Sequence, residues 1–147
     1  MNILKVKKLD ERACLPQKAT EHSACFDLRC VLDDPYVLQP GEFHSFNTGI
    51  AIEMPDPGCV ALVYSRSGMG AKHGISLSNS VGVIDYDYRG EVIVSLINNS
   101  DEPYRIEPGD RIAQLMIQRT EAVEAVFCEE LSETDRGSGG FGSTGQK

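Results

Sequence analysis

The chain has 147 residues, enough for one domain with a single core. Hydrophobic residues make up 41% of the sequence and charged residues 24%, a composition that excludes extensive disorder. Fourteen basic and 22 acidic residues give a formal net charge of −8, which argues against a protein that coats nucleic acid. Any phosphate ligand must therefore be held by a local group of donors.

The first eight residues, MNILKVKK, lack the apolar run and cleavage site of a signal peptide, and no apolar stretch reaches about 18 residues. The sequence therefore predicts a cytoplasmic protein, with a nuclear location as the alternative, and no contact with a membrane or with nucleic acid. The cysteines are odd in number and form no CxxC pair, which predicts buried thiols at Cys14, Cys25, Cys30, Cys59 and Cys128.

Short β-branched apolar segments, separated by turn signals, predict an all-β fold. The predicted strands cover residues 3–9, 26–32, 42–47, 49–53, 59–64, 81–84, 91–98, 111–118 and 122–127. Turns are predicted at residues 40–41, 55–58, 98–101 and 108–109, where Pro, Gly, Asn and Asp gather. The only helical turn is expected over residues 67–73. This pattern is typical of a compact jelly-roll-like β-barrel.

The composition changes near residue 121. Residues 121–135 hold six acidic and no basic residues, and residues 137–145 contain five glycines. We therefore expect one β domain over residues 1–135 and a flexible C-terminal lid segment of the same domain over residues 136–147.

The segment YSRSGMG, residues 64–70, leaves a predicted strand and enters the short helical turn. Backbone amides at a helix start, a serine hydroxyl and a guanidinium suit phosphate oxygens. A capped turn with a solvated arginine is the alternative, and this segment alone does not decide between them.

An apolar strand at residues 81–84 runs directly into the carboxylates Asp85 and Asp87. Partial burial at the strand end would raise the proton affinity of Asp85 and suit it to general-base catalysis. If the strand continued, Asp87 would share its face, and the pair could hold a metal. A simple hairpin turn is the more common reading, because aspartate and glycine favour turns.

Residues 136–145, RGSGGFGSTG, contain a literal GxGxxG from Gly137 to Gly142. The dinucleotide-binding fingerprint needs a preceding strand, a following helix and an acidic residue about 20 positions later, and only five residues follow Gly142. A Walker A loop is excluded because Ser143 stands where its lysine would be. Arg136 and Phe141 in so glycine-rich a tail predict a lid that closes on ligand, against the alternative of a disordered solubilising tail.

Other candidates are weaker. His22, Cys25 and Cys30 lack a fourth ligand at a zinc spacing, so zinc is not expected. Gln114 interrupts an apolar strand, and it lies either at a sheet edge or in a site. Arg111 is expected to be structural.

In order along the chain, five segments resemble the motifs of the trimeric dUTPase family, the deoxyuridine triphosphate nucleotidohydrolases. They read ACFDL (24–28), RSGMGAKHGI (66–75), GVIDYDYRG (82–90), PGDRIAQL (108–115) and RGSGGFGSTG (136–145). The resemblance spans about residues 20–145. Five ordered motifs are far more specific than any single one.

The resemblance implies a β jelly roll, a homotrimer with shared active sites, and hydrolysis of dUTP to dUMP and pyrophosphate. This reaction keeps uracil out of DNA and supplies dUMP for thymidylate synthesis. Water attacks the α-phosphorus while Mg²⁺ holds the triphosphate, and the tail crosses to a neighbouring subunit.

The site roles are carried over at the matched positions. Asp85 matches the aspartate that activates the water, Gln114 the amide that contacts water and phosphate, and Asp27 the carboxylate that holds Mg²⁺ through water. The implied substrate-binding residues are Arg66, Ser67 and Gly68 for the phosphates, Asn79, Val81, Gly82, Val83 and Ile84 for uracil, Tyr88 for the sugar, and Arg136, Phe141, Gly142 and Ser143 in the closing tail.

The sequence departs from the family pattern at Cys25 and Phe26 without losing a catalytic group. The dCTP deaminases, which resemble dUTPases in fold, carry a glutamate where this chain has Ser95, and this difference disfavours deamination. A nucleotide-gated regulatory or binding protein on the same fold is a further alternative. The set of Asp27, Asp85, Gln114 and Arg136 favours retained hydrolysis, because binding alone needs no carboxylate to activate water.

Overall fold

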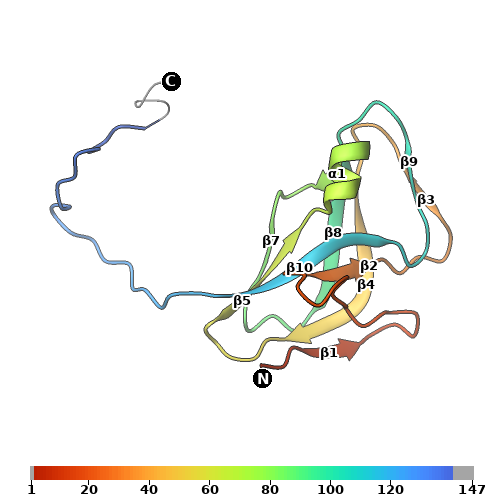
Figure 1. Cartoon of the computed structure of the whole chain (residues 1–147), viewed down its shortest axis with the longest axis horizontal. Coiled ribbons are helices and arrows are strands. Elements are labelled where there is room, and N and C mark those ends of the chain that lie inside the picture. The colour runs from red at the N-terminus through yellow and green to blue at the C-terminus, as the bar shows by residue number, and fades with distance from the viewer. Residues whose placement is uncertain (1, 141–147) are drawn as a thin grey trace.

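In a computed structural model that describes residues 2–140, the chain forms a mostly β structure with one short helix (Figure 1). The elements, in chain order, are β1 (Lys5–Lys8), β2 (Phe26–Arg29), β3 (Tyr36–Leu38), β4 (Phe43–Glu53), β5 (Cys59–Tyr64), α1 (Ser67–His73), β6 (Ile75–Leu77), β7 (Gly82–Ile84), β8 (Glu91–Asn98), β9 (Tyr104–Ile106) and β10 (Arg111–Arg119).

The strands form three antiparallel sheets. One has the order β1-β4-β8-β6, the second β2-β10-β5-β7, and the third is the pair β3-β9. The predicted all-β, jelly-roll-like fold is confirmed. Within residues 2–140 the strand pairs leave the sheets open rather than closing them into a barrel.

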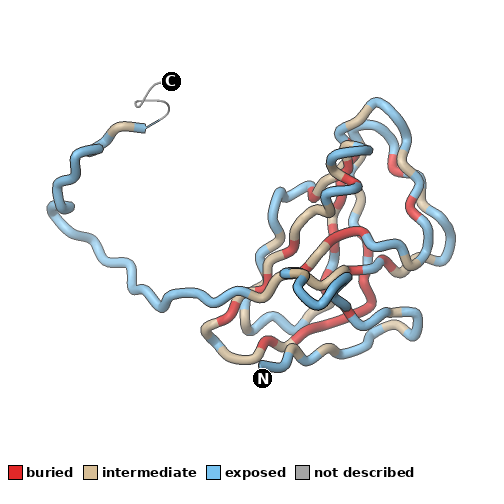
Figure 2. The backbone as a smooth tube through the Cα atoms, viewed as in Figure 1, coloured by how far each residue is buried: buried red, intermediate tan, exposed pale blue. Residues whose placement is uncertain are grey.

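The two larger sheets share one apolar core. Burial alternates along β5 and β8, as expected for strands with one face inward. Phe46, Val94 and Leu96 from one sheet belong to the same buried cluster as Leu28 and Leu115 from the other. Figure 2 shows buried stretches of the backbone within the body of the molecule. Each such side chain contributes about 1.5–3 kcal/mol of burial free energy, and together they make a rigid support for the loops.

The strand predictions were wrong at two places. Residues 42–47 and 49–53 were expected as separate strands, but β4 runs through Gly49, whose φ is +69°. A Cβ at Gly49 would lie 2.7 Å from the Cβ of Ala13, so the backbone approaches too closely for another residue there. Residues 122–127, also expected as a strand, lie in the exposed segment 120–140, which contains no strand.

Three short strands were missed, namely β3, β6 and β9, since three residues give too little alternation to be recognised. The helical turn over residues 67–73 is confirmed as α1. It buries Met69 and ends at Gly74, whose φ of 67° satisfies the left-handed C-cap.

The cysteines only partly follow the prediction. Cys30 and Cys59 are buried, but Cys14 and Cys128 are exposed and Cys25 is half-buried. Across residues 2–140, no helix is both long and apolar enough to cross a bilayer.

Candidate functional site

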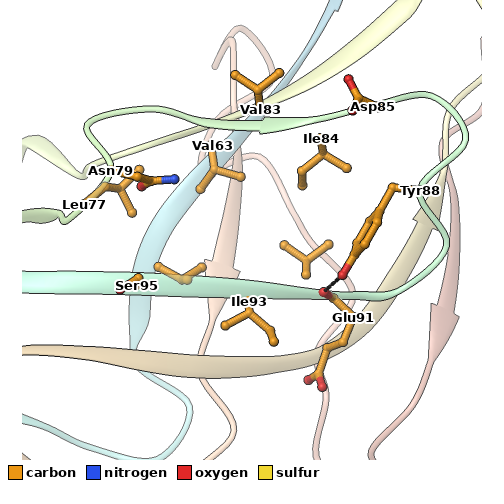
Figure 3. A pocket seen from close by; sticks show the side chains of 13 residues that line it. Val63, Leu77, Asn79, Val83, Ile84, Asp85, Tyr88, Glu91, Ile93 and Ser95 are labelled. Atoms are coloured by element: carbon orange, nitrogen blue, oxygen red, sulfur yellow. Dashed lines mark hydrogen bonds between the residues drawn. The ribbon is translucent and has the colours of Figure 1, made fainter.

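A cavity of about 260 Å³ lies between β7 and β8 (Figure 3). Its size is close to the lower end of the range for small-ligand pockets, roughly 300–1,000 Å³. Five residues expected to bind substrate line it, together with Asp85: Asn79, Gly82, Val83, Ile84 and Tyr88. Seven further residues line the cavity: Val63, Leu77, Glu91, Val92, Ile93, Val94 and Ser95. Sequence reasoning missed these seven because nothing local distinguishes them from ordinary strand residues.

The loop before β7, which was expected to be part of a hairpin, instead connects the two larger sheets, since β6 pairs with β8 and β7 with β5. It is held in a tight conformation. Ser80 has a φ of 66°, unusual for a non-glycine residue, and the amide of Val81 donates to the carbonyl of Asn79 at 2.8 Å. Gly82 is packed so closely on β5 that an added Cβ would lie 3.0 Å from the Cβ of Val63. The side chain of Asn79 and the backbone of β7 therefore face a narrow, preformed slot, which suits a flat ring with polar edges.

Tyr88 closes one end of the cavity. Its hydroxyl donates to the carbonyl of Glu91 at 3.0 Å (Figure 3). Its ring lies close to Gly90. A Cβ at Gly90 would come within 2.4 Å of the Tyr88 Oη. Glycine at position 90 therefore lets the ring lie flat against the chain.

Asp85 lies at the rim of this cavity, where β7 ends. The amide of Tyr88 donates to the carbonyl of Asp85 at 3.2 Å, so residues 85–88 form a turn. The extended strand that would have placed Asp87 on the same face is absent. The turn is present as predicted, but it is not a hairpin turn, because β7 pairs with β5 and β8 lies in the other sheet. The prediction that Asp85 is partly buried was also wrong for the single chain, in which Asp85 is exposed. In Figure 3 its carboxylate points away from the cavity, on the side opposite Ile84.

A second cluster lies at the Tyr64 end of β5, the end away from Asp85. The Asp27 carboxylate on β2 accepts a hydrogen bond from Arg111 Nη1 at 3.0 Å, and Arg66 Nε lies 3.3 Å from its second oxygen. Ser67 and Gly68 follow Arg66 at the start of α1. Gln114 stands on the same face as Asp27, directly opposite it in the pairing of β10 with β2.

Gln114 is not at a sheet edge, because β10 lies between β2 and β5. Its Nε2 donates to the carbonyl of Ser65 at 2.9 Å, which fixes the amide beside the chain that leads to Arg66. The sheet-edge alternative from the sequence is therefore wrong, and the direction of Gln114 toward a site stays a prediction.

This cluster is cationic although the chain as a whole is acidic. Arg29, Arg66 and Arg111 line one depression with Asp110, and Asp27 lies beside them. Burial and, to a lesser extent, the carboxylate of Asp110 raise the pKa of the Tyr104 phenol at the same place. The concentration of guanidinium groups suits a polyanionic ligand such as a phosphate chain.

The register of the sheet separates Asp85 from the second cluster within one chain. Gln114 on β10 lies opposite Tyr64 on β5, and Ile84 on β7 lies opposite Ala61 on the same strand β5. Three residues along an antiparallel strand span about 10 Å, and Asp85 and Arg66 extend beyond these positions in opposite directions. One copy of the chain therefore does not bring Asp85 next to Arg66.

The residues available for a divalent cation are few. Among residues 2–140, no three His, Cys, Asp or Glu side chains gather closely enough to hold a metal, zinc included. Each Asp27 oxygen already faces a guanidinium. Contact with a hydrated ion fits this arrangement better than a direct bond, since Mg²⁺ usually keeps several waters.

The C-terminal candidates are only partly described. Arg136 is exposed, and its Nε donates to the carbonyl of Gly139 at 2.8 Å. Residues 120–140 run away from the body of the molecule (Figures 1 and 2). Phe141, Gly142 and Ser143 lie outside the described residues.

The comparisons with known proteins agree with these features. A family model described as dUTPase matches residues 11–145. The deoxyuridine 5'-triphosphate nucleotidohydrolase of Idiomarina loihiensis is 48% identical over 150 residues, covering 99% of this chain and 99% of the relative.

Solved structures of phage dUTPases have the same fold. The dUTPase of Staphylococcus bacteriophage 80alpha, with dUpNHpp, is 31% identical with a TM-score of 0.87, and the match covers 99% of both chains. A mutant dUTPase of S. aureus phage phi11, described with a structural Mg(II) ion, is 26% identical with a TM-score of 0.80, covering 90% of this chain and 100% of the other.

Proposed function

The chain belongs to the dUTPase family and is a dUTP nucleotidohydrolase, and we propose that Asp85 activates the water that it uses. The observation that carries this proposal is the preformed slot at residues 79–84, which ends in an exposed carboxylate. Uracil presents a donor at N3 and an acceptor at O4, and cytosine inverts both. A fixed slot that pairs with uracil leaves cytosine's groups unpaired, which can discriminate by about 10⁴.

In the proposed reaction, Asp85 accepts a proton from water as the water oxygen bonds to the α-phosphorus. The bond from the α-phosphorus to the bridging oxygen breaks, and pyrophosphate leaves with the electron pair. Arg66, with Ser67 and Gly68, meets the charge that develops on the leaving group. Gln114 orients the water and a phosphate oxygen, and Arg136, together with the tail beyond it, covers the bound nucleotide.

Mg²⁺ is the proposed cofactor, and bound to the triphosphate it would neutralise part of the charge there. Asp27 would hold it through water, since both of its oxygens face arginines. The structural Mg(II) ion of the phage phi11 enzyme supports the compatibility of the fold with this metal.

We propose that the active site forms between copies in a homotrimer. Three observations support this. Asp85 and Arg66 lie at opposite ends of β5 within one chain. The outer face of β4 and β8 has no charged side chain at six neighbouring positions, Phe43, Ser45, Asn47, Ile93, Ser95 and Ile97. The segment 120–140 exposes Val123, Val126 and Phe127, apolar side chains that a neighbouring copy would cover.

The nucleotide pool for DNA synthesis is the proposed source of substrate, and the proposed location of the protein is therefore the cytoplasm.

A regulatory role is the second candidate function. It is favoured by the similarity to the 80alpha protein, because phage dUTPases are described as controlling transfer of virulence genes. Deamination of dCTP is disfavoured, because Ser95 is hydrogen-bonded to Ser78 Oγ and no glutamate stands there.

The test is release of pyrophosphate and ammonia from dUTP, dCTP, dTTP and UTP with Mg²⁺ present. We expect pyrophosphate from dUTP alone and ammonia from none. Equal rates for all four nucleotides, or ammonia from dCTP, would refute the proposal. Binding of dUTP without turnover would leave only the regulatory role.

A further inference from the structure

A β-bulge on β10 determines where Arg111 points. Gln114 and Ala113 pair with Asp27 and Leu28 in order, but the next partner of Arg29 is Arg111, so Ile112 is an extra residue. Ile112 and Ala113 are both buried, although neighbouring strand residues normally face opposite ways. The bulge therefore places Arg111 on the same face as Asp27 and Gln114. Without it, Arg111 would face the core.

Arg111 then contacts both other members of the charged cluster. Its Nη1 donates to one oxygen of Asp27 at 3.0 Å, and its carbonyl accepts a hydrogen bond from Arg66 Nη1 at 3.0 Å. Arg66 Nε lies 3.3 Å from the second Asp27 oxygen. The three residues form a closed ring of contacts in which Arg111 supplies two of the three links.

This ring limits how Asp27 can pair with Arg66. A carboxylate next to a single arginine tends to form a bidentate pair that uses two of its N–H groups. Here Arg111 occupies one oxygen, and among the hydrogen bonds within residues 2–140 none involves Arg66 Nη2. Both N–H groups of Arg66 Nη2 are therefore available to an incoming phosphate.

The arrangement has an electrostatic cost. Arg111 lies directly opposite Arg29 in the strand pairing, and like charges in this position are destabilising. No ion pair within residues 2–140 includes Arg29, whose Nη1 donates to the carbonyl of Gly109 at 2.7 Å. Arg111 is kept at this unfavourable position by a bulge. This observation favours a role for Arg111 in the site over a role in stability.

We propose that Arg111 is a positioning residue for dUTP hydrolysis, holding Asp27 away from a bidentate pair with Arg66 so that Arg66 can bind the triphosphate. The inference rests on the proposed function of the site. It revises the expectation from the sequence that Arg111 is only structural.

Three variants test it. Arg111→Gln removes the charge, Arg111→Lys keeps the charge but not the planar fork, and Arg119→Gln is the matched control. Arg119 lies at the far end of the same strand and pairs with Asp56 at 3.0 Å on an exposed surface. For each variant one measures affinity for a non-hydrolysable imido analogue of dUTP, kcat and KM for dUTP, thermal unfolding, and the NMR signal of the Arg66 Nε–H.

We expect Arg111→Gln to bind the analogue at least about tenfold more weakly, equivalent to about 1.4 kcal/mol. Its KM should rise more than its kcat falls, and its Arg66 signal should shift. Arg111→Lys should recover part of the affinity. Arg119→Gln should match the parent within about twofold, because exposed ion pairs contribute little.

Analogue affinity and an Arg66 signal in folded Arg111→Gln that equal those of the parent would overturn the inference, as would the same loss of affinity in Arg119→Gln. If Arg111→Gln does not fold, Arg111→Lys decides: an intermediate loss supports the inference, and parental affinity overturns it. Failure of the proposed function would be seen separately, as a parent protein that neither binds nor hydrolyses dUTP. The Arg66 signal in parent and variant would still decide the inference in that case.

Discussion

Replacing Gly90 with alanine should weaken the preference of the enzyme for deoxyribose over ribose. Tyr88, which we expect to pack beneath the sugar, lies over Gly90, and a Cβ there would be 2.4 Å from Tyr88 Oη and 2.5 Å from Cζ. Contacts under 3.0 Å are not tolerated, so the ring must move by about 1 Å to reach an ordinary separation of about 3.5 Å.

The displaced ring loses the hydrogen bond from Tyr88 Oη to the Glu91 carbonyl, which is 3.0 Å long. A typical hydrogen bond contributes about 0.5–1.5 kcal/mol. We take this as the free energy by which the ring prefers its position in the parent over the displaced position. Since about 1.4 kcal/mol corresponds to a factor of ten, the ratio of kcat/KM for dUTP over UTP should fall by about 2- to 13-fold.

The assay compares pyrophosphate release from dUTP and UTP in the parent, in Gly90→Ala and in Tyr88→Phe. Tyr88→Phe loses the same hydrogen bond but adds no steric clash, so its ratio should fall by no more than that of Gly90→Ala, and any larger fall in Gly90→Ala measures the clash. A Gly90→Ala enzyme that retains the parent ratio, with normal thermal unfolding, would show that the ring position does not control sugar selection.

Three further predictions follow from the site and the core. Asp85→Asn should lower kcat by about 10² to 10⁴ while the imido analogue still binds; near-normal kcat would remove Asp85 as the base. Deletion of residues 136–147 should leave a folded trimer with poor turnover, because residues 120–140 are exposed and contain no strand, and loss of the thermal unfolding transition would instead show a structural tail. Asn98→Ala should destabilise the fold by about 2–5 kcal/mol in urea unfolding, since the buried Asn98 amide makes four hydrogen bonds, to Leu38, Glu102 and, twice, Ser100. A loss below about 1 kcal/mol would contradict this account of Asn98.

The part of the site that we propose to bind the base was predictable from the sequence because its residues are contiguous. Asn79, Ile84 and Tyr88 lie in one continuous segment, and local turn chemistry brings them to one cavity. Glu91 and Val63 were missed, because they reach that cavity only through the pairing of separate strands. The failed strand at residues 122–127 has a related cause: its apolar alternation has no partner within the described chain, and propensity alone does not make a strand.

The amino-acid sequence by itself determined the all-β class, the turn positions and the identity of the groups that could do chemistry, because alternation, turn residues and motif spacing are local properties. Only the tertiary structure decided that Asp85 and Arg66 lie at opposite ends of β5, and that an extra residue on β10 turns Arg111 toward Asp27. Register and bulges depend on which strands pair. The free energy that selects the pairing comes from burial across both sheets, so the pairing cannot be predicted from any single segment of the sequence.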